Sequence, residues 1–171
     1  MITENSTPEE LIQEIDSTFK QLIDMISLLD YNQINQVPYE DSWTAGQLCS
    51  HVIKSTGGVA QVMKIDGKPS ENRSSEKVIE LRNIFLDFSI QMKSPQEIIP
   101  DDGPFEKQTL LTELSDCLKK LKENSNATSL GEVIEGLPFG PVSKYELLHF
   151  VLYHSQRHLR QLKRIYEAVL V

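Results

Sequence analysis

Apolar residues recur at every third or fourth position through most of this chain, and this spacing most limits the fold it can form. Such a period places one apolar stripe along a helix, whereas a half-buried strand alternates every second residue. No segment shows sustained alternation. Five helical segments are predicted, beginning after Thr7-Pro8, at Thr44, near Val78, before Leu111 and at Ser143. The pattern predicts an all-α protein, with a four-helix core and additional helical pieces.

Start and stop signals support these boundaries. Thr44 and Ser143 are each followed three residues later by Gln47 or Glu146, the spacing of a capping box. The second helix is then expected to run to about position 63 or 65. Residues 124–142 contain several Gly and Pro residues among apolar ones, which indicates an ordered loop rather than a linker.

The third helical segment is the one between two breaks in the pattern. The stretch around Asp66-Gly67 ends the helix before it, and Ser94-Pro95 ends the third helix itself. Its apolar positions, three and four residues apart, are Val78, Leu81, Phe85, Phe88 and Met92. We therefore expect this helix to continue through Met92.

Size and charge exclude several classes of protein. The 171 residues suit one domain, 1–171, and no internal repeat is present. The net charge of −8 is the opposite of what binding to nucleic acid or to an anionic membrane requires. No run approaches the ~20 apolar residues of a membrane span, and no signal peptide is evident. Two cysteines, Cys49 and Cys117, are too few for a disulfide framework, so we expect buried free thiols and a cytoplasmic protein.

The four histidines are the informative residues for function. His154 and His158 are four apart, so they share one face of the last helix, and that face also carries its apolar residues. His51 lies two turns into the second helix and faces inward on the same reasoning. His149 falls among the charged residues of the last helix, so we expect it to be exposed.

Two interpretations account for three inward histidines. Each imidazole could be a core residue whose ring nitrogens are satisfied by neighbouring groups. Alternatively, His51, His154 and His158 could share a divalent metal, because imidazole is the commonest metal ligand. Spacing alone supports the two about equally. The residues between His154 and His158 include no carboxylate, which excludes the H-E-x-x-H helix of zinc proteases.

Longer motifs point to a family. They are Ser42-Trp43-Thr44, the run from Gln47 to His51, Gly140-Pro141-Val142-Ser143 and the run from His154 to Leu162. Together they resemble the DinB superfamily, which includes YfiT-like metal-dependent hydrolases, and the resemblance extends from the first helix to the last. It implies an up-down-down-up four-helix bundle with long loops, and a metal, nickel or zinc, held by His51, His154 and His158. It also implies a homodimer as a prior expectation.

The resemblance further implies a chemistry. Some members of the family are thought to transfer a low-molecular-weight thiol, such as bacillithiol or glutathione, onto an electrophile. We hypothesise either this reaction or hydrolysis, on a small-molecule substrate. Trp43, Gln47 and Gln161 are the candidate pocket or second-layer residues. Trp43 could equally pack the helix start, and the two glutamines could be ordinary polar positions.

Two alternatives stay open. The protein could be a metal-binding or small-ligand-binding stress-response module without turnover, which the missing carboxylate base favours. It could also be a relative that keeps the fold without the metal, although all three histidines are present. The segment from Asp66 to Ser75 and the loop before Ser143 are expected to shape the mouth of the site.

Overall fold

The computed structural model describes residues 2–70 and 76–170. Most of the chain is helical, as predicted. The helices are α1 (Pro8–Leu28), α2 (Tyr31–Asn35), α3 (Ala45–Val62), α4 (Glu76–Leu86), the 3-10 turn η1 (Gln96–Ile98), α5 (Lys107–Asn126) and α6 (Lys144–Val169). The strands are β1 (Lys68–Pro69), β2 (Glu132–Ile134) and β3 (Val142–Ser143).

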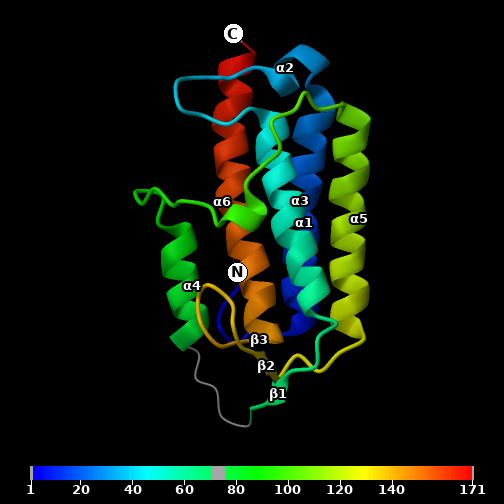
Figure 1. The fold of residues 1–171 in the computed structure, drawn as a ribbon, viewed down its shortest axis with the longest axis vertical. Coiled ribbons are helices and arrows are strands. Elements are labelled where there is room, and N and C mark those ends of the chain that lie inside the picture. Colours follow the sequence, from blue (N-terminus) through cyan, green and yellow to red (C-terminus); the bar gives the residue numbers. More distant parts are fainter. Residues whose placement is uncertain (1, 71–75, 171) are drawn as a thin grey trace.

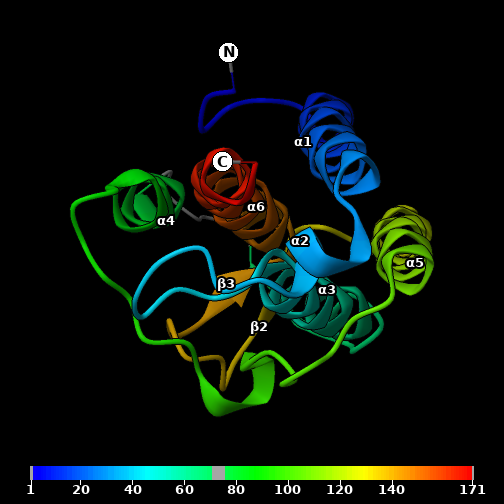
Figure 2. The same cartoon turned by 90° about the horizontal axis from the view of Figure 1, so that it is seen from above.

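Helices α1, α3, α5 and α6 form the four-helix bundle. In Figure 1, α1 runs upward, α3 and α5 run downward and α6 runs upward again, which is the up-down-down-up order. Packing contacts join α1 to α5 and α6, and join α3 to α5 and α6. The additional helix α4 packs on the outside of α6, as the view from above shows (Figure 2). Helix α6 therefore has neighbours on several sides.

The bundle begins where the sequence indicates. Thr7, Thr44 and Ser143 are the N-caps of α1, α3 and α6, and each forms a complete capping box. Each box satisfies backbone N–H groups that the first helical turn leaves without partners. The apolar stripe of α1, with Leu11, Phe19 and other residues, is fully buried. The sequence thus fixes both the start and the inner face of these helices.

Helix α4 ends earlier than predicted, at Leu86. Phe88 and Met92 were expected on its inner face, but they are 44% and 43% exposed. The Asp87 side chain accepts hydrogen bonds from the Ser89 N–H and hydroxyl, a local turn that competes with the helix. Arg157 of α6 donates to the carbonyl oxygens of Phe85 and Asp87 (3.3 and 2.8 Å) and to that of Ile90. A long-range contact therefore ends this helix, and local periodicity does not reveal it.

A small antiparallel sheet was not predicted, because its strands of two or three residues are too short to show alternation. Strand β2 lies between β1 and β3. The buried Lys144 Nζ contacts Glu132 Oε2 at 2.5 Å and fixes the sheet to the start of α6.

Parts of the two loops expected at the mouth of the site build this sheet, ~15 Å along α6 from His154. Phe139, in the loop before Ser143, lies 5.1 Å from the ring of Phe150, which itself borders His154. Residues 71–75 lie outside the described part of the chain.

The expectation that His149 is exposed is wrong, because its side chain is fully buried. The sequence argument assumed that the charged face of this helix meets water. In the structure, α6 is instead covered by α1, α3 and α4. On the side of His149, the rings of Tyr145 and Tyr153 lie 4.9 and 5.6 Å away. The Tyr145 hydroxyl in turn donates to the carbonyl oxygen of Ser6, so the N-terminal segment covers this side.

In the described part of the chain, no helix combines the length and the hydropathy that crossing a membrane requires.

Candidate metal centre

Three buried histidines from two helices meet between α3 and α6. The Nε2 atom of His154 lies 3.0 Å from Nε2 of His51 and 3.2 Å from Nε2 of His158. One ring nitrogen of each residue lies within 4.8 Å of those of the others. The i, i+4 spacing places His154 and His158 on one side of α6, and the packing of α3 against α6 brings His51 to them.

Hydrogen bonds at the far side of two rings fix their tautomers. His51 Nδ1 lies 2.7 Å from the carbonyl oxygen of Ile98, and His158 Nδ1 lies 3.0 Å from Oε1 of Gln161. Carbonyl and amide oxygens only accept, so both Nδ1 atoms carry the proton. In a neutral imidazole the other nitrogen, Nε2, then has a free lone pair. Two lone pairs therefore point at His154 Nε2, which can supply at most one proton.

Burial keeps these imidazoles neutral. Desolvation lowers the pKa of His51, and it lowers that of His158 to about 3. The pKa of His154 is well below 6.5, first because of burial and then because of the other two imidazoles. Neutral imidazole is the form that binds metal. The cluster is therefore ready to coordinate without first losing protons at neutral pH.

The geometry and the donor set fit a transition-metal ion. Two imidazole nitrogens bound tetrahedrally at ~2.0–2.1 Å are separated by about 3.3 Å, close to the 3.0 and 3.2 Å found here. Nitrogen donors suit zinc, nickel or iron rather than calcium or magnesium. The candidate cluster formed by the described residues contains three histidines and no carboxylate. Three protein ligands leave room for a further ligand.

Aromatic side chains surround the cluster. The Trp43 ring lies 4.9 Å from that of His51 and 6.4 Å from that of His158. Phe85 and Phe150 lie 5.8 and 5.2 Å from the ring of His154, and both are almost fully buried. These rings limit the access of water to one side of the cluster, which strengthens electrostatic interactions inside it.

The predicted residues thus lie in different places. The structure brings Trp43 and Gln161 to the histidines, whereas Gln47 forms the capping box with Thr44. The carbonyl of Ile98 was missed, because a backbone oxygen on a distant 3-10 turn leaves no mark in the sequence. The sequence indicated only that a buried His51 would need a hydrogen-bond acceptor for its Nδ1, and not which group supplies it.

The cysteines do not supply a nucleophile. Cys49 and Cys117 are buried free thiols, as predicted. Burial raises the pKa of each thiol to about 12. A thiol is reactive as the thiolate, so both side chains are inert at neutral pH.

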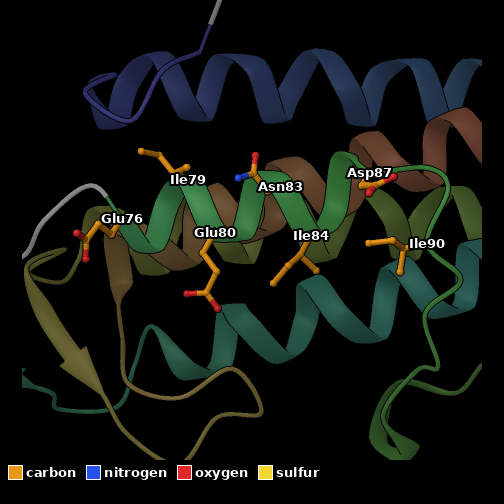
Figure 3. Close-up of a pocket in the computed structure, with 7 residues that line it drawn as sticks. All are labelled: Glu76, Ile79, Glu80, Asn83, Ile84, Asp87 and Ile90. Carbon is orange, nitrogen blue, oxygen red and sulfur yellow. The ribbon is translucent and has the colours of Figure 1, made fainter.

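A surface hollow of about 570 Å³ lies elsewhere, along the outer side of α4 (Figure 3). Its lining residues all belong to α4 or the turn after it, and they include Glu80, Ile84 and Ile90. None of the three histidines lines it. The hollow and the histidine cluster are therefore separate features.

The fold and the site together define a four-helix bundle that carries a cluster of three histidines able to bind a metal. The chain belongs to the DinB superfamily, whose family model matches residues 14–162. YfiT from Bacillus subtilis, which is proposed to be a metal-dependent hydrolase with an unusual four-helix bundle topology, is similar in structure. Its TM-score is 0.66 at 11% identity, over 98% of this chain and 91% of YfiT.

Two further proteins are similar to this chain, one in structure and one in sequence. TT2238, a four-helix bundle protein, has a TM-score of 0.61 at 16% identity, over 92% of this chain and 98% of its own. At such identities, structural likeness shows the fold alone. Glial cell line-derived neurotrophic factor from Xenopus laevis is 25% identical over 101 residues, which are 59% of this chain. The chain spans only 40% of that curated relative, and we draw no functional inference from it.

Gln161 offers a test of the site. Replacing it by Ala removes the acceptor that orients His158, and loss of such a partner typically weakens metal binding ~10–100-fold. We expect Gln161→Ala to do so in competition titrations with a chromogenic chelator, and Gln161→Glu to retain most of the affinity. Gln156→Ala, on the same helix, is the control and should bind like the wild type. Equal affinity in Gln161→Ala would exclude this role.

Proposed function

We propose that this protein is a metal-dependent enzyme. It would use a nickel or zinc ion held by His51, His154 and His158 to activate a thiol or water against a small electrophilic substrate. One observation carries the proposal: two Nε2 lone pairs, fixed by bonds to Ile98 and Gln161, converge on His154 Nε2. If the three histidines were ordinary core residues, each ring N–H would face an acceptor and each ring lone pair would face a donor. A shared cation accounts for three converging nitrogens.

A divalent ion in such a site supplies Lewis acidity, which lowers the pKa of a coordinated water or thiol. The chain's own residues do the rest. His51, His154 and His158 would hold the ion, while Ile98 and Gln161 keep two of the rings in their ligating tautomer. Trp43 and Phe85 would keep bulk water from the side of the site that they cover.

Thiol transfer suits this site better than hydrolysis aided by a side-chain base. The cluster contains no carboxylate, and both cysteines stay protonated. A nucleophilic thiolate must then come from a small co-substrate, and activation by the ion needs no adjacent base. We propose a low-molecular-weight thiol in this role.

The absence of a carboxylate from the cluster also supports a second candidate, a metal-binding or ligand-binding protein without turnover. The two are distinguished by a rate measurement. Metal-loaded and chelator-stripped protein would be assayed with glutathione or bacillithiol and a generic electrophile, and separately with activated esters and amides. We expect a rate that depends on both metal and thiol, and that is lost in His154→Ala. Metal binding without any metal-dependent rate would identify a binder.

A further inference from the structure

The carbonyl oxygen that fixes the tautomer of His51 belongs to the long connection between α4 and α5, residues 87–106. The structure describes every residue of this connection, and η1 is the one regular element that it contains. In η1 the carbonyl oxygens of Pro95 and Gln96 accept backbone N–H groups, whereas that of Ile98 accepts from His51. Long connections with so little secondary structure are uncommon, and many of them serve a functional site. A carbonyl can orient a ring only if its own segment is held in place.

Side chains of α3 on both sides of His51 hold that segment. Lys54 places its Nζ 2.9 Å from the carbonyl oxygen of Ile99 and 2.8 Å from Oδ1 of Asp101. Ser50 donates to Oδ2 of Asp101 and accepts from the Asp101 N–H, both at 3.3 Å. In Figure 1, η1 lies at the middle of the bundle, and packing contacts join it to α3. We call Ser50, Lys54 and Asp101 the loop clamp, and its four bonds flank the bond of His51.

The loop clamp is suited to fixing a position rather than to stabilising the whole fold. The side chains of Lys54 and Asp101 are 33% and 68% exposed, and an exposed ion pair contributes little to stability. Ile98 and Ile99 are successive residues, so a bond to the second carbonyl restrains the first. The bond from His51 Nδ1 to Ile98 is 2.7 Å, at the short end of the usual range. Such a bond keeps its geometry only if both partners are held to within about 0.5 Å, and the clamp does this for the carbonyl.

We propose that the three residues of the loop clamp are positioning residues for His51. They hold the Ile98 carbonyl against Nδ1, so that Nε2 keeps the lone pair that a metal needs. If the carbonyl moved away, the ring could take its other tautomer, with the proton on Nε2 and no lone pair facing the cluster. The inference rests on the proposed function for the metal, whereas the tautomer of His51 is a property of the protein without an ion.

The test first determines the tautomer of His51 in chelator-stripped, full-length protein at pH 7.5. Burial lowers the pKa of His51 below 6.5, so the ring is neutral at this pH. Nitrogen chemical shifts then distinguish a protonated ring nitrogen from one with a free lone pair, and in the wild type we expect the proton on Nδ1. Lys54→Met/Asp101→Ala removes three of the four clamp bonds, and we expect it to show a mixture of both tautomers. Lys54→Arg keeps a donor for both oxygens and should retain the wild-type tautomer.

The second measurement is the affinity for zinc, by competition with a chromogenic chelator. Loss of a ligand's hydrogen-bond partner typically lowers metal affinity ~10–100-fold. Because the clamp acts one bond further out, we expect Lys54→Met/Asp101→Ala to bind zinc about tenfold more weakly, the lower end of that range. The matched control, Lys20→Met/Asp24→Ala, removes an exposed ion pair of α1 and should equal the wild type in tautomer and in affinity.

The wild-type tautomer in Lys54→Met/Asp101→Ala would overturn the inference even if the melting temperature fell, because a clamp that only anchors the loop gives that result. Unchanged zinc affinity in this variant of a protein that binds zinc would overturn it too, as would the same losses in the control. A changed tautomer in a protein that binds no zinc would support the positioning of His51 and contradict the proposed function instead.

Discussion

Replacing His154 by Ala is expected to abolish stable metal binding. His154 Nε2 lies between the Nε2 atoms of His51 and His158, so its loss leaves two ligands on separate helices without the one that joins them. We expect the affinity to fall at least about 100-fold, more than the ~10–100-fold that follows loss of a ligand's hydrogen-bond partner. Elemental analysis of protein purified without a histidine tag should give one metal per chain for the wild type. It should give well below that for His154→Ala.

His149→Phe is the matched control for this variant. His149 is also a buried histidine of α6, but it lies outside the cluster. We expect it to retain the wild-type metal content. Added metal should also raise the melting temperature of the wild type and of His149→Phe, because a ligand that binds only the folded state stabilises it. No such rise is expected for His154→Ala. A wild-type metal content in His154→Ala would contradict the ligand assignment.

Much of the bundle could be predicted because its signals are local. The capping boxes at Thr44 and Ser143 involve residues three apart, and the apolar stripes follow from helix geometry alone. The histidine pair on α6 is likewise a spacing within one helix. The place of His51 beside that pair needed the packing of α3 on α6, which the family resemblance implied and periodicity did not.

The features that were missed depend on contacts between distant segments. Helix α4 ends at Leu86 because Arg157, some 70 positions later, takes carbonyl oxygens that a longer helix would use. His149 is buried because the N-terminal segment covers a side of α6 that the charged residues around it assign to solvent. The bond from His51 to Ile98 joins a side chain to a backbone oxygen. None of these contacts has a pattern within one element.

The chelator-stripped protein is expected to lose stability steeply as the pH falls below 6.5. Burial lowers the pKa of His149 from 6.5 to about 4, and His149 Nε2 has no partner among the described residues. Above pH 6.5 the folded and unfolded chains are both neutral at this residue, so the stability is fully present. Between pH 6.5 and 4 the unfolded chain binds a proton that the folded chain does not. The free energy of unfolding then decreases by up to about 1.4 kcal/mol per pH unit for this group.

The three histidines of the cluster act in the same direction without metal, because the pKa of each is also lowered. His149, His154 and His158, whose pKa values are lowered furthest, together approach about 4 kcal/mol per pH unit once the unfolded chain is protonated, against a total stability of roughly 5–15 kcal/mol for a domain. We therefore expect the stripped protein to lose much of its stability by pH 5. Urea denaturation from pH 7.5 to 5 measures this, since the slope of the unfolding free energy against pH counts the protons taken up.

His149→Phe isolates the contribution of one group to that slope. The Phe ring fills a similar volume, but the variant removes both the partnerless Nε2 and the Nδ1 that lies 3.2 Å from the Tyr153 hydroxyl. The slope against pH, rather than the stability at pH 7.5, is therefore the quantity to compare. Below pH 6 its slope should be smaller by about one proton per chain. Circular dichroism at pH 7.5 confirms that the variant is folded. An unchanged slope would mean that His149 is already protonated in the folded protein, and that its buried side accommodates a charge.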